Sequence, residues 1–176
     1  MKIGLCGTVS VGKTTLVNAL KELPQFKDFT FATERSKYLR DLGIPLNTDS
    51  TMKGQTVFLA ERLSELMNEN LITDRTVIDV MAFTQCSKTI DSLDKEKFRN
   101  YTADFIKEYD YIFYISPDGV EIEDNGVRET DAEYRDLIDF TIKHYVNINH
   151  NKMKNYKQIS GTTEQRIQQI LEVISL

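Results

Sequence analysis

The amino-acid sequence predicts a three-layer α/β fold, in which a mainly parallel, five-stranded sheet carries helices on both faces. Two observations support this prediction. Strand-like apolar segments alternate with segments of helical periodicity, and a glycine-rich motif joins the first strand to the first helix. Strands that alternate with helices run parallel and are joined by right-handed crossovers. The chain has 176 residues, of which 40% are hydrophobic, so we expect residues 1–176 to form a single domain.

The first half of the chain contains two clear strands and three helices. Residues 2–6 are mostly apolar, and residues 29–33 alternate as a strand does. Leucines at helical spacing predict a helix that ends at Pro24, and Gly43 closes a shorter helix. A third apolar stripe predicts another helix. The three helices are expected over about 13–23, 35–42 and 55–68.

Residues 71–80 allow two interpretations. Either residues 71–74 form the third strand and Val77 begins a helix, or residues 76–79 form the strand. The choice decides whether Asp74 or Asp79 follows the strand.

The second half of the chain contains the clearest buried strand, residues 111–115, which Pro117 stops. A polar, glycine-bearing loop follows, and we expect residues 118–131 to act as a lid. The other expected elements are a helix over 95–109 capped by Asp94, a helix over 132–146, a strand over 156–160 and a helix over 163–175.

Residues 7–14, Gly-Thr-Val-Ser-Val-Gly-Lys-Thr, match the phosphate-binding P-loop pattern GxxxxGK[ST] directly after the first strand. The two glycines allow successive backbone N–H groups to turn onto phosphate oxygens, and the following helix adds its positive dipole end. Lys13 should contact the β- and γ-phosphates, and the Thr14 hydroxyl should bind Mg²⁺. We therefore predict that ATP and Mg²⁺ bind at Gly7, Thr8, Val9, Ser10, Val11, Gly12, Lys13, Thr14 and Thr15.

Motifs that are absent from the sequence narrow the class of P-loop protein. The chain has no NKxD or DxxG motif of a GTPase and no LSGGQ-like signature of a transporter ATPase. An AAA+ motor would need a second, helical domain, for which 176 residues leave no room. A phosphotransferase remains by elimination.

Acid–arginine pairs follow two of the predicted strands. Glu34-Arg35 comes after the second strand and Asp74-Arg75 after the first candidate for the third. Both pairs should lie at the same sheet edge as the P-loop. A carboxylate there can orient an acceptor hydroxyl and take its proton, while arginines stabilise phosphoryl charge. A solvated carboxylate at a helix start is the alternative for Glu34. Asp74 is predicted to hold the metal, and Asp79 replaces it if residues 76–79 form the strand.

Two arginines near the predicted lid are candidates for contact with the triphosphate. Arg128 lies in the loop and is predicted to be catalytic, because a closing lid can carry an arginine onto bound ATP. Arg135 follows two helical turns later, and a surface salt bridge is its alternative role. After the last strand, Gly161 is predicted to lie beside the adenine, although an ordinary helix cap explains the same segment.

These segments resemble the small P-loop domains related to bacterial nicotinamide riboside kinase and the thymidylate and deoxynucleoside kinases, phage-type members included. The resemblance spans Met1 to Glu172 and rests on the P-loop, Glu34-Arg35, Asp74-Arg75 and the region of Arg128. It implies that an Asp-Arg pair after the third strand serves the active site, which favours Asp74 over Asp79. It also implies that Glu34 lies near the acceptor. Thymidylate kinases have proline where Arg35 stands, so the resemblance does not transfer the acceptor's identity.

The acceptor is expected between Glu34, the helix that carries Gln55 and the Asp74-Arg75 corner. Gln55 either reads a base edge or is a solvated amide, and Phe58 and Phe83 either stack on a ring or fill the core. The predicted acceptor-binding set is Glu34, Arg35, Gln55, Arg75, Asp79 and Arg135, and the predicted catalytic set is Lys13, Glu34, Asp74 and Arg128.

Composition limits the partners and the compartment. The net charge of −5 argues against duplex binding, two cysteines do not make a disulfide framework, and no segment approaches the roughly 18 apolar residues of a membrane span. We expect a cytoplasmic protein, either a monomer or a homodimer.

The sequence therefore predicts an ATP-dependent kinase acting on a nucleoside or nucleotide. Two alternatives stay open. One is a kinase acting on DNA, with a basic strip formed by Lys88, Lys95, Lys97 and Arg99, and the other is a regulatory ATP-binding module.

Overall fold

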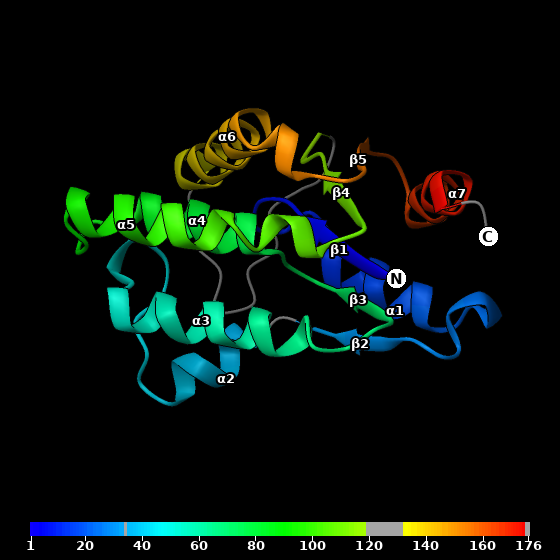
Figure 1. The fold of residues 1–176 in the computed structure, drawn as a ribbon, viewed down its shortest axis with the longest axis horizontal. Coiled ribbons are helices and arrows are strands. Elements are labelled where there is room, and N and C mark those ends of the chain that lie inside the picture. Colours follow the sequence, from blue (N-terminus) through cyan, green and yellow to red (C-terminus); the bar gives the residue numbers. More distant parts are fainter. Residues whose placement is uncertain (34, 119–131, 175–176) are drawn as a thin grey trace.

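The computed structural model describes residues 1–33, 35–118 and 132–174, which form an all-parallel, five-stranded sheet with helices on both faces (Figure 1). The strands lie in the order β2-β3-β1-β4-β5, and every neighbouring pair is parallel. Their bounds are β1 Lys2–Cys6, β2 Thr30–Ala32, β3 Leu71–Thr73, β4 Tyr111–Ile115 and β5 Tyr156–Ile159. The predicted three-layer α/β fold is confirmed.

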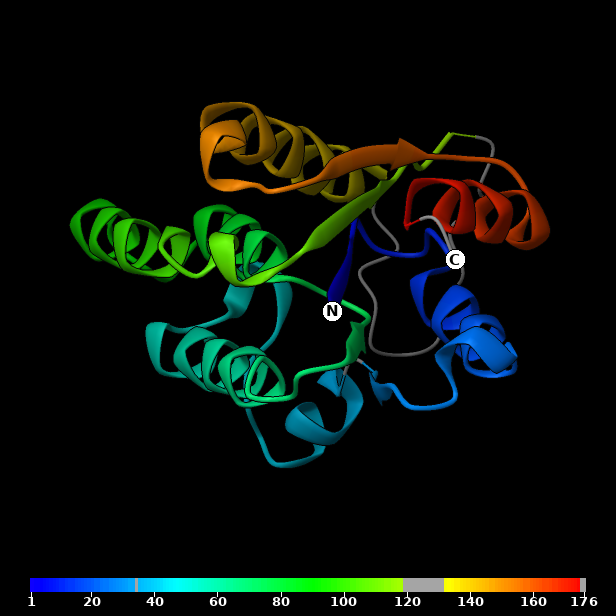
Figure 2. The same cartoon turned by 45° about the vertical axis from the view of Figure 1, so that its right-hand side comes forward.

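The helices divide into two groups, one on each face of the sheet (Figure 2). Helices α1 and α7 pack together on one face, where Leu16, Leu20 and Ile170 bury against β1 and β4. Helices α3, α4 and α6 cover the other face, and α5 packs along α4. The helices are α1 Lys13–Lys21, α2 Ser36–Asp41, α3 Met52–Glu65, α4 Val77–Cys86, α5 Ser92–Ala103, α6 Ala132–Ile148 and α7 Thr163–Ile174.

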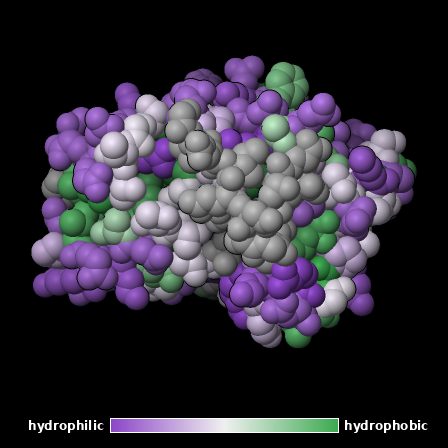
Figure 3. Space-filling model, turned by 180° about the vertical axis from the view of Figure 1, so that it is seen from behind, coloured by the Kyte–Doolittle hydropathy of each residue, from purple (hydrophilic) through white to green (hydrophobic). Residues whose placement is uncertain are grey.

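The core accounts for most of the hydrophobic side chains that the structure describes. On the face seen in Figure 3, the surface is mainly hydrophilic, with apolar residues in scattered groups. Among the described residues, no helix has both the length and the apolar composition needed to cross a bilayer.

The structure decides the ambiguous segment in favour of the first interpretation. Strand β3 ends at Thr73, and α4 begins at Val77 with Thr76 as its N-cap. Thr76 and Asp79 form a capping box. The Thr76 hydroxyl accepts the backbone N–H of Asp79, and the Asp79 carboxylate accepts the backbone N–H of Thr76. The alternative strand over residues 76–79 is wrong, since these residues build a helix start.

Two helix starts differ from the sequence prediction because other side chains provide the caps. Helix α3 begins at Met52, since the Thr51 hydroxyl accepts the Gly54 N–H at 3.2 Å. Helix α5 is capped by Asp91 rather than Asp94, and it ends at Ala103 before a short 3₁₀ turn.

The order of the strands positions the site. Strand β1 pairs with β3 in register, with Gly4 opposite Thr73, so Gly7 and Asp74 leave neighbouring strands at the same edge. Strand β2 is hydrogen-bonded to β3, and the Asp74 N–H donates to the Ala32 carbonyl at 2.9 Å. The carboxyl edge of the sheet therefore brings the P-loop and the Asp74-Arg75 corner together.

Candidate active site

The P-loop joins β1 to α1 and adopts the backbone that its glycines allow. Gly12 is the N-cap of α1 with φ 81°, and as a glycine it offers the first-turn N–H groups no side-chain acceptor. Ser10 also has positive φ, at 57°. Successive N–H groups at such a turn and an open helix N-terminus form an anion-binding concavity. The local structure thus fits phosphate binding.

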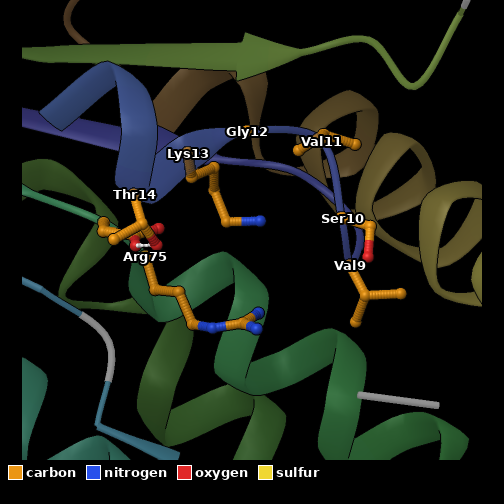
Figure 4. A pocket seen from close by; sticks show the side chains of 8 residues that line it. Val9, Ser10, Val11, Gly12, Lys13, Thr14 and Arg75 are labelled. Atoms are coloured by element: carbon orange, nitrogen blue, oxygen red, sulfur yellow. Dashed lines mark hydrogen bonds between the residues drawn. The ribbon is translucent and has the colours of Figure 1, made fainter. Parts of the chain in front are cut away.

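Lys13 folds back along the loop that precedes it. Its Nζ donates to the Gly7 carbonyl at 2.6 Å and to the Thr8 carbonyl at 2.7 Å. The side chain is buried, and its ammonium group lies on the inner side of the loop (Figure 4). A cation is therefore held where a phosphate would enter.

Thr14 and Asp74 are in direct contact. The Thr14 hydroxyl donates to Asp74 Oδ2, and Asp74 is almost fully buried at the edge of the same pocket. A hydroxyl and a carboxylate oxygen suit Mg²⁺, which keeps most of its other positions for water and phosphate oxygens. In the described part of the chain no three His, Cys, Asp or Glu side chains cluster as metal ligands.

Arg75 extends along the pocket beside Lys13 (Figure 4). Its guanidinium carbon lies 4.7 Å from the centre of the Phe83 ring, and Nη1 lies 3.9 Å from Asp79 Oδ1. The aromatic ring and the carboxylate orient the guanidinium group. Arg75 therefore presents a fixed positive charge next to the phosphate loop.

Asp79 lies beneath the loop and is fully buried. Its Oδ2 accepts the Thr76 N–H at 2.8 Å and the Thr76 hydroxyl at 2.9 Å, and Oδ1 accepts the Gly7 N–H at 3.2 Å. The carboxylate is directed at backbone of the protein, which argues against the predicted contact with an acceptor.

The other predicted acceptor residues lie on different elements. Gln55 is in the first turn of α3 and only 3% exposed, so the alternative of a solvated amide is wrong. Phe58 and Phe83 are partly buried against the core on the same face of the sheet. Arg35 is half-exposed, lies 4.4 Å from the centre of the Tyr38 ring and pairs with Glu61 at 3.5 Å.

Arg135 is buried in the first turn of α6, which argues against the alternative of a surface salt bridge. Its Nη2 donates to the Pro117 carbonyl at 3.4 Å, and its own carbonyl accepts the Thr8 hydroxyl at 2.8 Å. Helix α6 is therefore bonded directly to the P-loop. Gly161 follows β5 with φ 94°, a conformation that favours glycine.

Comparison with known proteins agrees with this geometry. Residues 2–166 match the AAA domain family AAA_28. The chain belongs to the AAA_28 family. Membership describes the P-loop domain, and motor activity does not follow from it. No curated protein matches the sequence.

Solved structures with the fold of this AAA domain include a deoxyadenosine kinase and two other proteins with bound nucleotides. The structure resembles deoxyadenosine kinase from M. mycoides with bound dATP, at 17% identity and a TM-score of 0.65, over 100% of both chains. It resembles the NadR protein in complex with NAD and AMP-PNP, at 14% identity and a TM-score of 0.75, over 99% of this chain and 49% of that one. It also resembles the YorR protein of Bacillus subtilis in complex with phosphorylated GDP, at 15% identity and a TM-score of 0.57, over 100% and 96% of the two chains. The predicted resemblance to small P-loop kinases is confirmed at the level of fold.

Two predicted catalytic residues of the AAA domain, Glu34 and Arg128, lie outside the described residues. Residues 119–131, which make up nearly all of the expected lid, lie outside them as well. Their roles stay predictions from the sequence.

One charged residue at the P-loop was missed by the sequence analysis. Arg166 of α7 is 5% exposed, and its Nη1 donates to the Val11 carbonyl at 2.7 Å. The signal was present, since Arg166 precedes the buried Ile170 and Ile174 by one and two helical turns and so belongs to the apolar stripe.

The four residues proposed as a basic strip for DNA do not form a uniformly positive surface. Lys95 donates to the Ser87 carbonyl at 2.6 Å, and Arg99 lies 3.9 Å from Glu96. Asp91 caps the same helix and Asp94 lies in its first turn. Helix α5 therefore carries mixed charge, which does not favour binding to a polyanion.

Proposed function

We propose that this AAA domain is a Mg²⁺- and ATP-dependent kinase that transfers the γ-phosphate of ATP to a nucleoside or nucleotide. One observation carries the proposal: Lys13, Thr14, Asp74 and Arg75 line a single pocket at the P-loop. Two cations and a hydroxyl–carboxylate pair are the groups that phosphoryl transfer needs around the terminal phosphate. Their convergence from the start of α1 and the end of β3 supports transfer chemistry beyond simple nucleotide binding.

Each residue has a role in this proposal. Backbone N–H groups of the loop bind the β-phosphate, and Lys13 turns from the carbonyls of Gly7 and Thr8 to the phosphate oxygens. Thr14 and Asp74 would hold Mg²⁺. The metal, when bound, neutralises charge that develops on the phosphate oxygens. Arg75 stabilises the transferred group, because its guanidinium is already oriented by Phe83 and Asp79.

A small acceptor on the α3–α4 side fits the arrangement best. Gln55 is buried near the start of α3, and an amide there can pair with the edge of a base while Phe58 or Phe83 contacts its ring. M. mycoides deoxyadenosine kinase and YorR bind deoxynucleotides and a guanine nucleotide, which supports a nucleoside or nucleotide acceptor. Glu34 as the base and Arg128 as the lid arginine complete the proposal from the sequence alone.

A turnover assay tests this function. The chain is incubated with Mg-ATP and a panel of ribo- and deoxynucleosides, their monophosphates and a DNA oligonucleotide, and ADP release and labelled product are measured. We expect one class of nucleoside or nucleotide to stimulate ADP release and to carry the label. The Asp74→Asn variant should lose this stimulation. Labelled DNA would support the DNA kinase instead, and slow hydrolysis that no acceptor stimulates would support the regulatory module.

A further inference from the structure

The P-loop is bonded at both ends to buried charged side chains from other elements. Asp79 of α4 accepts the N–H of its first residue, and Arg166 of α7 donates to the carbonyl of Val11, next to its last glycine. We propose that Asp79 and Arg166 are positioning residues that hold the loop in the shape that receives phosphate. This inference rests on the proposed use of the loop for ATP.

The Asp79 end joins three structural elements through one carboxylate. Oδ2 is held by the N–H and hydroxyl of Thr76, so the carboxylate is fixed to the first turn of α4. Oδ1 then accepts the Gly7 N–H at 3.2 Å and lies 3.9 Å from Arg75 Nη1. Because Gly7 is the first residue of the loop, this bond fixes the direction in which the chain leaves β1. It also keeps the loop in register with Arg75.

The Arg166 end sets the direction of a peptide plane. In a trans peptide the C=O and the N–H of the following residue point in opposite directions. Arg166 holds the Val11 carbonyl at 2.7 Å on the side of α7, so the N–H of Gly12 points away from α7. A β-carbon on Gly12 would lie 3.3 Å from Arg166 Nη1, so the close approach of the guanidinium also uses the glycine. Arg166 thereby orients a donor at the start of α1.

The energetics favour a positioning role over an ordinary stabilising contact. A buried carboxylate beside a polyphosphate site repels the ligand, and burial of a guanidinium lowers the pKa of Arg166 because desolvation opposes its charge. Within the described residues, Arg166 Nε has no hydrogen-bond partner, so the desolvation is only partly compensated. Charge-assisted bonds are about twice as strong as neutral ones, which makes such groups effective at fixing backbone. Both charged groups are therefore suited to fixing the backbone of the loop.

The experiment compares variants that remove each bond with a control that only weakens the fold. Arg166→Met keeps the length and removes the donor, Arg166→Lys keeps the charge, and Asp79→Asn replaces an acceptor oxygen with a donor. Ile170→Ala is the matched control, because Ile170 lies one turn from Arg166 in the same buried face of α7. Dissociation constants for Mg-ATP and for Mg-pyrophosphate are measured by calorimetry, at a temperature where every variant is folded. Pyrophosphate reports the loop without the adenine.

We expect Arg166→Met and Asp79→Asn each to weaken binding of both ligands about tenfold or more, because a loop released from a charge-assisted bond must be ordered when the phosphate binds. Arg166→Lys should recover part of the loss, since an ammonium can still donate to the Val11 carbonyl. Ile170→Ala should lower the melting temperature and leave both dissociation constants near the wild-type values. The double variant Asp79→Asn/Arg166→Met should lose less than the sum of the single variants, because one loop is held by both residues. If Arg166→Met does not fold, Arg166→Lys and Asp79→Asn still carry the comparison.

Wild-type affinity for both ligands in Asp79→Asn and Arg166→Met would overturn the proposal. A loss in Ile170→Ala equal to theirs would do the same, because it would show that the variants act through stability. The binding measurement needs no acceptor, so wild-type binding of Mg-ATP with no acceptor-stimulated turnover would contradict the kinase and not the positioning role. A wild-type chain that binds neither ligand would overturn both.

Discussion

At the scale of single residues, the least expected detail is where Lys13 lies. Its ammonium group is bonded to the carbonyls of Gly7 and Thr8, the two residues at the start of the loop it serves. Lys13 thus donates to two carbonyl oxygens, which a phosphate cannot do because it is itself an acceptor. The ammonium group also offsets the partial negative charge of these oxygens. A ligand must draw the ammonium group from these oxygens.

The Lys13→Met variant tests this role. It removes the charge and keeps most of the apolar stem, so we expect the rate of phosphoryl transfer to fall at least about a hundredfold, as for loss of one preorganised donor to a transition state. Activity is measured by ADP release with the acceptor identified in the panel. Thermal unfolding serves as the control, and a variant that is folded and fully active would contradict the role.

Arg75→Lys separates the geometry of a guanidinium from its charge. Lysine keeps the charge but cannot combine contact with the Phe83 ring and two parallel hydrogen bonds, so its ammonium group is poorly oriented. We expect kcat to fall about tenfold or more while KM for ATP changes little, because the contact matters most in the transition state. Steady-state kinetics over ATP concentration measure both constants. An increase in KM alone would instead assign Arg75 to binding of the substrate.

At the scale of elements, β1 packs tightly against the start of α4. A β-carbon on Gly4 would lie 2.5 Å from Thr76 Cγ2 and 2.9 Å from two carbons of the Tyr109 ring. Only a glycine allows the strand, the helix cap and the aromatic ring to meet. This contact supports the cap that also holds Asp79.

Gly4→Ala should therefore destabilise the fold by about 1–3 kcal/mol, the usual cost of overpacking. Urea unfolding measures the loss. The double variant Gly4→Ala/Thr76→Ser provides the control, because serine keeps the capping hydroxyl and removes the methyl group that clashes. It should recover part of the loss, and no recovery would assign the clash to Tyr109 alone.

The same segment shows what local sequence can and cannot predict. Thr76, Val77 and Ile78 are β-branched residues, which favour a strand, so the pattern was ambiguous. The reciprocal hydrogen bonds of Thr76 and Asp79 stabilise the start of a helix here. In the sequence, a threonine followed three residues later by an acidic residue is the signal for such a cap. The P-loop and the Asp74-Arg75 pair could be predicted, because each is a run of adjacent residues that comes after a strand. The apolar stripe of α7 indicated that Arg166 is buried, but its contact with the P-loop could not be predicted, because Val11 is 155 residues away and only the tertiary fold joins them.

At the scale of the whole molecule, Asp110 ties three strands together at the edge opposite the site. Its carboxylate accepts the Lys2 N–H at 2.8 Å and pairs with Lys154 at 2.8 Å, and its backbone bonds to Lys2 and Asn155. These contacts connect the beginnings of β1, β4 and β5. Ionic and hydrogen-bonded contacts thus join the amino ends of these strands, whereas the candidate active site lies at the carboxyl ends.

The charge state of Asp110 predicts how stability depends on pH. Partial burial acts to raise its pKa, but the bonds from Lys154 and the Lys2 N–H outweigh it and hold the pKa below the ordinary value of 3.8. A lowered pKa in the folded state contributes stability that is present above pH 3.8 and is lost as the pH falls through the folded value.

Urea unfolding between pH 5 and pH 2 checks this sign, with the range set to bracket carboxylate titration at about pH 4. The free energy of unfolding should fall less steeply with pH in Asp110→Asn than in the wild type. Lys154→Met should also flatten the dependence, because it removes one cause of the shift. Equal slopes in all three proteins would show that Asp110 contributes nothing to the acid sensitivity.

The bond between Arg166 and Val11 has a consequence for biosynthesis. Val11 and the arginine that holds it lie 155 residues apart, so in the nascent chain the glycine-rich segment lacks one of its two anchors until Arg166 has been synthesised. Translation products that end before residue 166 would then contain the P-loop motif but bind nucleotide weakly.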